Sequence, residues 1–177
     1  MGWKAAERMP DEPLVADGPP TVGLLGSVLG LAGWLVLTFC APLAAISSPP
    51  ADWYESLNKP YWHPPSWVFG PVWTVLYLLM AVAAWLVWRQ GGWRVRRRPL
   101  TAYLVQLALN AAWSPAFFGL QSPGLALGVI LGLLTAIVVT LKVFHSVSRT
   151  AALLLVPYLL WVNFATVLNL TLWLMNR

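Results

Sequence analysis

The sequence predicts an all-α integral membrane protein built as a bundle of five transmembrane helices. The chain is 59% hydrophobic and only 10% charged, whereas soluble domains carry about 25% charged residues. Its mean hydropathy is +0.68. Charge-free apolar stretches near the length of about 20 residues that crosses a bilayer recur along the chain. These observations exclude a water-soluble globule, a disordered chain and a collagen-like chain. The single cysteine, Cys40, excludes an intrachain disulfide.

Five apolar stretches are expected to span the membrane, and together they form one domain over residues 21–177. In chain order, the predicted spans cover about 22–46, 67–88, 100–120, 124–143 and 151–175. Residues 1–20 are polar and rich in proline, so we expect a flexible tail there.

Each span is supported by its length and by its flanking residues. The first is about twice as long as the apolar part of a signal peptide and follows acidic as well as basic residues, which favours a retained helix. The second follows Pro64-Pro65, the third follows Arg98, and the fourth reaches Lys142. The fifth contains Pro157, where we expect a kink.

Basic residues predict the orientation. Five arginines lie in the loop between the second and third spans, and Lys142 and Arg149 lie between the fourth and fifth. With five spans these loops share one side with the N-terminus, so the N-terminus is predicted to be cytoplasmic. The arginines suit anionic headgroups, and the short juxtamembrane cluster does not indicate a nucleic-acid site.

Several kinds of chemistry lack support in the sequence. All six acidic residues lie at or before Glu55, which excludes a paired-carboxylate site and a carboxylate proton relay within the spans. His63 and His145 have no second histidine or cysteine at metal-ligand spacing, so no metal site is predicted. We interpret His63 as an interfacial polar residue, with axial ligation of a haem as the alternative.

Tryptophan is unusually frequent, with 12 residues, and seven of them lie between Trp53 and Trp93. A membrane-interface belt accounts for tryptophans at span ends, but not for Trp73 and Trp113 inside spans. The first loop is stiffened by prolines, which favours a lid over a flat apolar ligand. Gln106 and Asn110 share one helix face, where they either link helices or donate to a ligand.

Small residues recur every four positions in two spans. Gly124, Gly128 and Gly132 form one such set, and Ala108 and Ala112 belong to another. In apolar helices this spacing indicates close helix packing, either within the chain or across a dimer seam.

The stretch WYESLNKPYWHPPSWVFGPVWTVLY, followed by QLALNAAW, FFG and PYLLW, resembles the TspO/MBR family of tryptophan-rich sensory and translocator proteins. The resemblance covers about residues 22–175. It implies a five-helix bundle, commonly a homodimer, that binds a porphyrin or another flat apolar small molecule in a pocket closed by the first loop. No cofactor is required; a porphyrin such as protoporphyrin IX is the expected ligand.

The resemblance also implies which residues meet the ligand. Trp73 and Trp161 correspond to the tryptophan pair tied to porphyrin binding and to light-dependent porphyrin breakdown, in which they would be the catalytic residues. The expected ligand-binding residues are Tyr54, Trp62, Trp73, Tyr77, Gln106, Asn110, Trp113, Trp161 and Ala165. Leu170 and Leu174 replace the family's sterol pattern, and Leu125 replaces a pocket tryptophan of animal members.

Three functions follow from these residues and from the resemblance. The first is a membrane receptor, sensor or transporter that binds porphyrins. The second is light-dependent porphyrin degradation that uses Trp73 and Trp161. The third is a ligand-sensing regulatory partner of another membrane protein.

Overall fold

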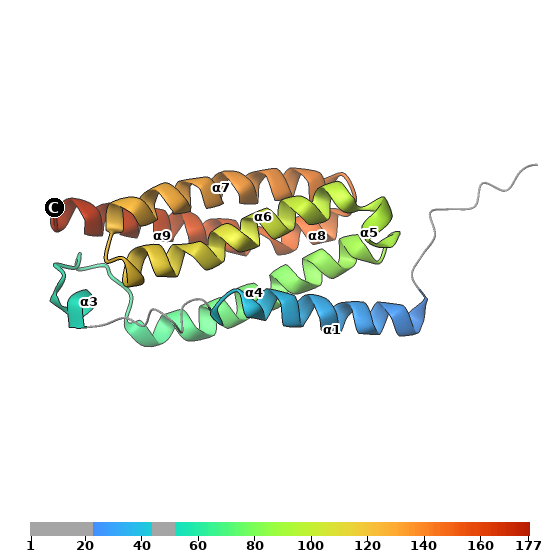
Figure 1. Ribbon diagram of the computed structural model, residues 1–177, viewed down its shortest axis with the longest axis horizontal. Helices are drawn as coiled ribbons and strands as arrows, with labels where there is room; N and C mark the ends of the chain where they lie inside the picture. Colours follow the sequence, from blue (N-terminus) through green and yellow to red (C-terminus); the bar gives the residue numbers. More distant parts are fainter. Residues whose placement is uncertain (1–22, 44–51) are drawn as a thin grey trace, which may run out of the picture.

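In a computed structural model, which describes residues 23–43 and 52–177, the chain forms an elongated bundle of helices (Figure 1). The tail predicted for residues 1–20 lies outside these residues. Five long helical segments run along the bundle, and two short helices lie at its ends (Figure 1). The elements are α1 (Leu24–Cys40), α3 (Asp52–Ser56), α4 (Ser66–Trp88), α5 (Gly92–Val95), α6 (Arg97–Ser114), η1 (Pro115–Gly119), α7 (Pro123–His145), α8 (Arg149–Leu154) and α9 (Val156–Met175).

The composition of three described segments suits a membrane span. By length and hydropathy, α4, α7 and the combined segment Arg149–Met175 can each cross a bilayer, while α1 is apolar but shorter at 17 residues. The third predicted span is formed by α6 and η1, and α6 starts within the basic segment at Arg97. The all-helical membrane bundle predicted from composition is therefore confirmed.

Local chemistry sets several helix boundaries. At α7, the Ser122 hydroxyl accepts a hydrogen bond from the backbone N–H of Leu125 and Pro123 occupies the first turn, which is a common helix start. The fifth span is divided at Leu155, two residues before Pro157, because a proline ring disturbs the preceding helical turn. The kink predicted at Pro157 is observed as an interruption of the helix at Leu155.

The third long helical segment, which consists of α6 and η1, changes its hydrogen-bonding pattern at Pro115. Residues Pro115–Gly119 form a π-helical turn, in which the backbone N–H of Leu120 donates to the carbonyl of Pro115 at 2.9 Å. Such turns are rare and often occur at functional sites. This one places Phe117 in the protein interior, where the side chain is 1% exposed.

Close packing and a few hydrogen bonds join α1 to the bundle. A Cβ atom added to Gly30 would collide with the indole ring of Trp88 on α4, so this glycine permits the two helices to meet. The Thr38 hydroxyl is hydrogen-bonded to the hydroxyl of Tyr103 on α6 at 2.7 Å. Gly30 therefore serves packing within the chain.

Charge is distributed unequally between the two ends of the bundle. The start of α1, the helix α5 and the α7–α8 turn lie at one end, and α3 and the C-terminus lie at the other (Figure 1). The basic segments around α5 and between α7 and α8 therefore share an end, as the five-span topology requires. Which side of the membrane this end faces stays a prediction from the basic residues.

Candidate functional site

A cavity of about 480 Å³ lies in the half of the bundle nearest α3. Proteins bind small ligands in cavities of about 300–1,000 Å³ that are mainly apolar with a few polar groups. The wall is built by the two residues that follow α1 and by α3, α4, α6 with η1, α7 and α9. Its residues are Ala41, Pro42, Tyr54, Glu55, Ser66, Phe69, Gly70, Trp73, Tyr77, Asn110, Trp113, Ser114, Phe117, Phe118, Ile130, Leu133, Trp161, Val162, Ala165, Leu168, Asn169 and Leu172.

Seven of the nine residues expected to bind a ligand lie on this wall. They are Tyr54, Trp73, Tyr77, Asn110, Trp113, Trp161 and Ala165. They come from four separate elements, so the fold brings together positions that are more than 100 residues apart in the chain. Their contact with a ligand stays a prediction.

Trp62 and Gln106 do not line the cavity. Trp62 lies in the loop before α4 and packs edge to face against Phe164 of α9, with ring centroids 6.0 Å apart. Gln106 is buried in α6, one turn before Asn110, and neither polar atom of its amide has a hydrogen-bond partner among the described residues. Trp62 thus lies in the loop that covers the bundle end.

Aromatic rings pack against each other around the cavity. Trp73 stacks on Tyr77 with ring centroids 5.3 Å apart. Trp113, also on the wall, stacks on Phe117 with ring centroids 5.1 Å apart. Phe69 contacts Trp161 edge to face at 5.9 Å. The rings thus support one another, and their remaining surfaces are suited to a flat aromatic ligand.

Most polar groups on the wall already have partners within the protein. The Tyr77 hydroxyl donates to Oδ1 of Asn110 at 2.8 Å, and Nδ2 of Asn110 donates to the Tyr158 hydroxyl at 3.1 Å. Nε1 of Trp113 donates to Oδ1 of Asn169 at 3.1 Å. These bonds tie α4, α6 and α9 together and leave the wall largely apolar.

Nε1 of Trp161 differs from the paired polar groups of the cavity wall. This nitrogen is buried and has no hydrogen-bond partner among the described residues. A buried N–H without a partner is costly.

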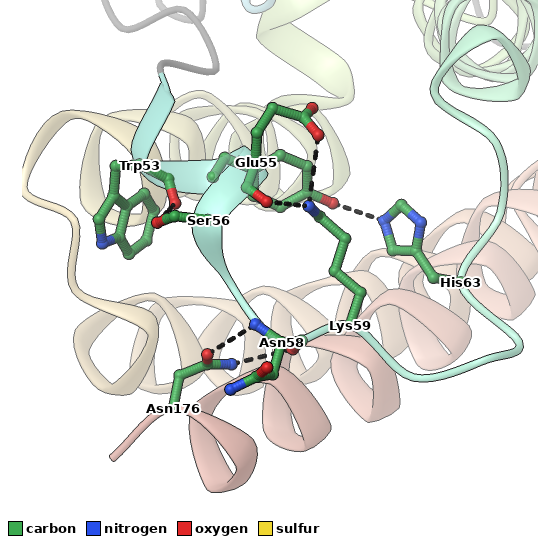
Figure 2. Close-up of polar contacts among 8 residues, drawn as sticks. Trp53, Glu55, Ser56, Asn58, Lys59, His63 and Asn176 are labelled. Atoms are coloured by element: carbon green, nitrogen blue, oxygen red, sulfur yellow. Dashed lines mark hydrogen bonds and ion pairs between the residues drawn. The ribbon is translucent and has the colours of Figure 1, made fainter.

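The short helix α3 and the loop that follows it are fastened by polar contacts at the cavity end (Figure 2). The backbone N–H of Asn58 donates to Oδ1 of Asn176 at 2.8 Å, and Nδ2 of Asn176 donates to the Asn58 carbonyl at 3.0 Å. This pair of bonds joins the loop to the end of α9. Lys59 reaches back to Glu55, with its Nζ 3.4 Å from Oε2.

Tyr54 on the cavity wall is bound to a histidine of the loop. Its hydroxyl and Nε2 of His63 are 2.5 Å apart, and Nζ of Lys59 lies 4.8 Å from the centre of its ring. Burial raises the pKa of Tyr54 to about 12, and the Glu55 carboxylate adds to the increase. Burial lowers the pKa of His63 below 6.5, Lys59 lowers it further, and Glu55 opposes this change.

Sequence reasoning missed several aromatic wall residues. Phe69 is four residues before Trp73, and Phe117 is four residues after Trp113. Because residues four apart share a helix face, this spacing could have identified both phenylalanines. The hydrogen bond between Trp113 and Asn169 joins residues 56 positions apart and leaves no signal in the sequence. Among the described residues, no group of three or more metal-binding side chains occurs.

Comparison with known proteins places the chain in a family. The model of the TspO/MBR family matches residues 27–174. The chain is 46% identical to the human Translocator protein over 127 residues, which are 71% of this chain and 75% of that protein. It is 42% identical to the Tryptophan-rich protein TspO of Archaeoglobus fulgidus over 124 residues, 70% of this chain and 80% of that protein. It is 40% identical to the Tryptophan-rich sensory protein of Cereibacter sphaeroides over 140 residues, 76% of this chain and 87% of that protein. These matches, together with the aromatic cavity inside a helical bundle, show that the chain belongs to the TspO/MBR family.

Proposed function

We propose that this protein is a membrane receptor, sensor or transporter that binds porphyrin-like tetrapyrroles in the aromatic cavity beneath α3. The observation that supports this most strongly is that Trp73, Trp113 and Trp161 share the wall of one cavity of about 480 Å³. A flat macrocycle offers two large faces to such rings. The names of the relatives, translocator and sensory protein, agree with a role in moving or detecting a small molecule.

The polar rim supports an amphipathic ligand in particular. Tyr54 and Glu55 reach the cavity from α3, and Lys59 stands against Tyr54. A porphyrin with its ring among the aromatic side chains would direct its carboxylates toward this end, where they would compete with the Glu55 carboxylate for Nζ of Lys59. The same geometry explains why the inner wall needs few free hydrogen-bond donors.

A binding titration tests the proposal. Protoporphyrin IX is added to the purified protein in detergent, and the shift of the porphyrin absorption band is compared with that in empty micelles. Each aromatic contact contributes about 0.5–1.5 kcal/mol beyond buried area. Removing two of them in Trp73→Leu, Trp161→Leu should therefore raise Kd by about 5- to 150-fold.

Trp67→Leu is the matched control, because Trp67 lies on the same helix but is 75% exposed and does not line the cavity. Its Kd should equal that of the wild type. Binding no tighter than to empty micelles contradicts porphyrin recognition. Equal affinity in the double variant and the wild type contradicts the assigned site.

A second candidate function is light-dependent porphyrin degradation, favoured by the presence of both Trp73 and Trp161 on the cavity wall. Replacing each by phenylalanine keeps an aromatic face but removes the easily oxidised indole. If the indoles take part, Trp73→Phe and Trp161→Phe should bind porphyrin but fail to convert it under light and oxygen. Conversion at the wild-type rate in the double phenylalanine variant contradicts this role.

A homodimer is also part of the proposal. Gly30 and Gly124 already face Trp88 and Trp173 of the same chain, whereas a Cβ added at Gly132 would meet no described atom within 4 Å. The open glycine face of α7 therefore suits contact with a second copy. Disulfide crosslinking of Gly132→Cys in a Cys40→Ala background tests this, and failure to crosslink in membranes contradicts the assigned face.

A further inference from the structure

Tyr54 and His63 form a pair that crosses the cavity wall. The Tyr54 side chain lines the cavity, and its hydroxyl is hydrogen-bonded to Nε2 of His63 at 2.5 Å. His63 itself is not among the wall residues and is partly exposed in the loop before α4. In Figure 2 this bond is the dashed line that ends at His63. The Tyr54 phenol therefore lines the cavity, and the His63 imidazole, which can accept a proton, binds its hydroxyl from outside the wall.

The protonation states of the pair suit transfer of a proton from the phenol to the imidazole. Burial raises the pKa of Tyr54 to about 12, so the phenol keeps its proton at neutral pH. Burial and Lys59 lower the pKa of His63, so its imidazole is neutral and has a free electron pair. The charged groups beside the pair are Lys59, at 4.8 Å from the Tyr54 ring, and Glu55, which contacts Lys59.

We propose that Tyr54 and His63 act as a proton-coupled electron donor to a photoexcited tetrapyrrole in the cavity. This inference rests on the proposed function, because the excited macrocycle is the oxidant. Tyr54 and His63 thereby gain a redox role that is separate from that of the Trp73 and Trp161 pair.

The step balances in atoms and electrons. One electron passes from the Tyr54 ring to the excited macrocycle, which becomes a radical anion. The Tyr54 O–H bond breaks as the electron leaves, and its proton forms an N–H bond at Nε2 of His63. The products are a neutral tyrosyl radical, an imidazolium and the reduced macrocycle. Return of the electron and proton restores the starting state.

The basic partner distinguishes Tyr54 from the other wall tyrosine. The Tyr77 hydroxyl donates to Oδ1 of Asn110 at 2.8 Å. An amide oxygen accepts a hydrogen bond but is not a base at neutral pH. An oxidised tyrosine is a strong acid and needs a proton acceptor, and of the two tyrosines among the described wall residues only Tyr54 is hydrogen-bonded to one. The position of His63 therefore determines which tyrosine is oxidised.

Electron paramagnetic resonance (EPR) tests the proposal on the full chain in detergent. Protein with ordinary or ring-deuterated tyrosine is saturated with protoporphyrin IX without oxygen and frozen under continuous illumination, so that the radical is trapped before the electron returns. Bound porphyrin is measured on the same samples by its absorption shift. The wild type should give a radical whose spectrum narrows with tyrosine deuteration, in proportion to bound porphyrin.

Variants identify the two residues. Tyr54→Phe keeps the ring in the wall and should remove the tyrosyl signal. His63→Gln keeps a hydrogen-bond acceptor without a base and should lower the yield by about 100-fold, the lower end of what a positioned proton acceptor contributes. Tyr61→Phe is the matched control in the same loop, because Tyr61 is 101% exposed and does not line the cavity. Its yield should equal that of the wild type.

A pH series gives a readout that a purely structural role would not move. The wild-type yield should fall as the pH drops through the lowered pKa of His63, because an imidazolium cannot accept the proton. The yield of His63→Gln should stay flat, and Glu55→Gln should shift the midpoint because Glu55 opposes the lowering.

The outcomes separate this inference from the proposed function. Tight binding with no tyrosyl radical, or with a radical that survives Tyr54→Phe, overturns the inference and leaves porphyrin binding intact. A radical lost in Tyr77→Phe but kept in Tyr54→Phe also overturns it. Absence of porphyrin binding overturns both.

Discussion

Replacing Gly30 by alanine tests the packing of α1 against α4. The added Cβ would overlap three ring atoms of Trp88, which itself belongs to α4. Either the indole or the helix must move, because ring atoms cannot be compressed. Overpacking of this kind costs about 1–3 kcal/mol. We therefore expect Gly30→Ala to lower the free energy of unfolding by an amount in this range, less the gain in helix propensity.

Gly33→Ala measures the gain in helix propensity without any overlap with a neighbouring side chain. Gly33 lies three residues later on the same helix, and a Cβ added there meets nothing within 4 Å. An alanine in place of a helical glycine is favourable by about 0.5–1 kcal/mol. Gly33→Ala should therefore be neutral or stabilising. Because the gain in helix propensity is common to both variants, they should differ by the overpacking cost alone, about 1–3 kcal/mol.

The assay is unfolding of the purified protein in mixed micelles, with SDS as the denaturant and circular dichroism as the signal. Both alanine variants are compared with the wild type in one detergent. Equal unfolding curves for Gly30→Ala and Gly33→Ala would refute the close approach of Gly30 to Trp88. A more stable Gly30→Ala would show that the indole moves away without cost.

Three further predictions concern the cavity end. Trp113→Phe removes the hydrogen-bond donor to Asn169 and leaves Oδ1 of that buried amide without this partner. The variant should therefore be less stable by about 1–3 kcal/mol in the same assay. An unchanged unfolding midpoint would show that the Trp113–Asn169 bond does not stabilise the protein. Asn176→Ala removes both hydrogen bonds to the Asn58 backbone. In stopped-flow measurements, porphyrin should therefore dissociate faster from this variant than from the control Arg177→Ala. Equal dissociation rates would show that these two bonds do not restrain the loop. The pKa of His63 is lower in the folded protein than its ordinary value of 6.5, so the unfolded chain binds more protons below that value. Stability should therefore decrease as the pH falls through 6.5 toward the folded pKa, and this decrease should be smaller in His63→Gln, as measured by thermal unfolding at several pH values.

Hydropathy predicted the membrane helices because burial in lipid demands long apolar segments with all backbone groups paired. The predicted span 67–88 differs from α4 by one residue, since Pro64 and Pro65 end the loop sharply. The first span was expected to reach residue 46, whereas α1 ends at Cys40, two residues before Pro42. Residues 44–51 lie outside the described part of the chain.

Features governed by local hydrogen bonds were not predictable in this way. Apolarity is the same for α-helical and π-helical turns, so the π turn beginning at Pro115 leaves no hydropathy signal. The helices α3 and α5 have five and four residues, too short for any periodic pattern.

The site was only partly predictable for a related reason. The family resemblance identified wall residues such as Trp73 and Asn110, because it carries three-dimensional information that composition lacks. The bond between Tyr54 and His63 depends on how the loop folds back over the bundle. No spacing rule connects a loop histidine with a tyrosine nine residues earlier.

The π turn at Pro115–Gly119 also changes how the outer surface of the third long helical segment is ordered. Ala108, Ala112 and Ala116 would form one stripe along an unbroken α-helix. Ala108 and Ala112 are exposed, but Ala116 is only 6% exposed, so the stripe stops at the turn. A π turn holds one more residue than an α turn. Deleting a single residue from 115–119 would therefore remove the underwound turn and leave the segments on either side facing much as they do now, whereas a deletion from an unbroken α-helix rotates them by about 100°. The π turn thus gives this end of the helix a place where the chain can lose one residue without changing which side faces lipid and which faces the cavity, and the regular turns of α6 do not offer this.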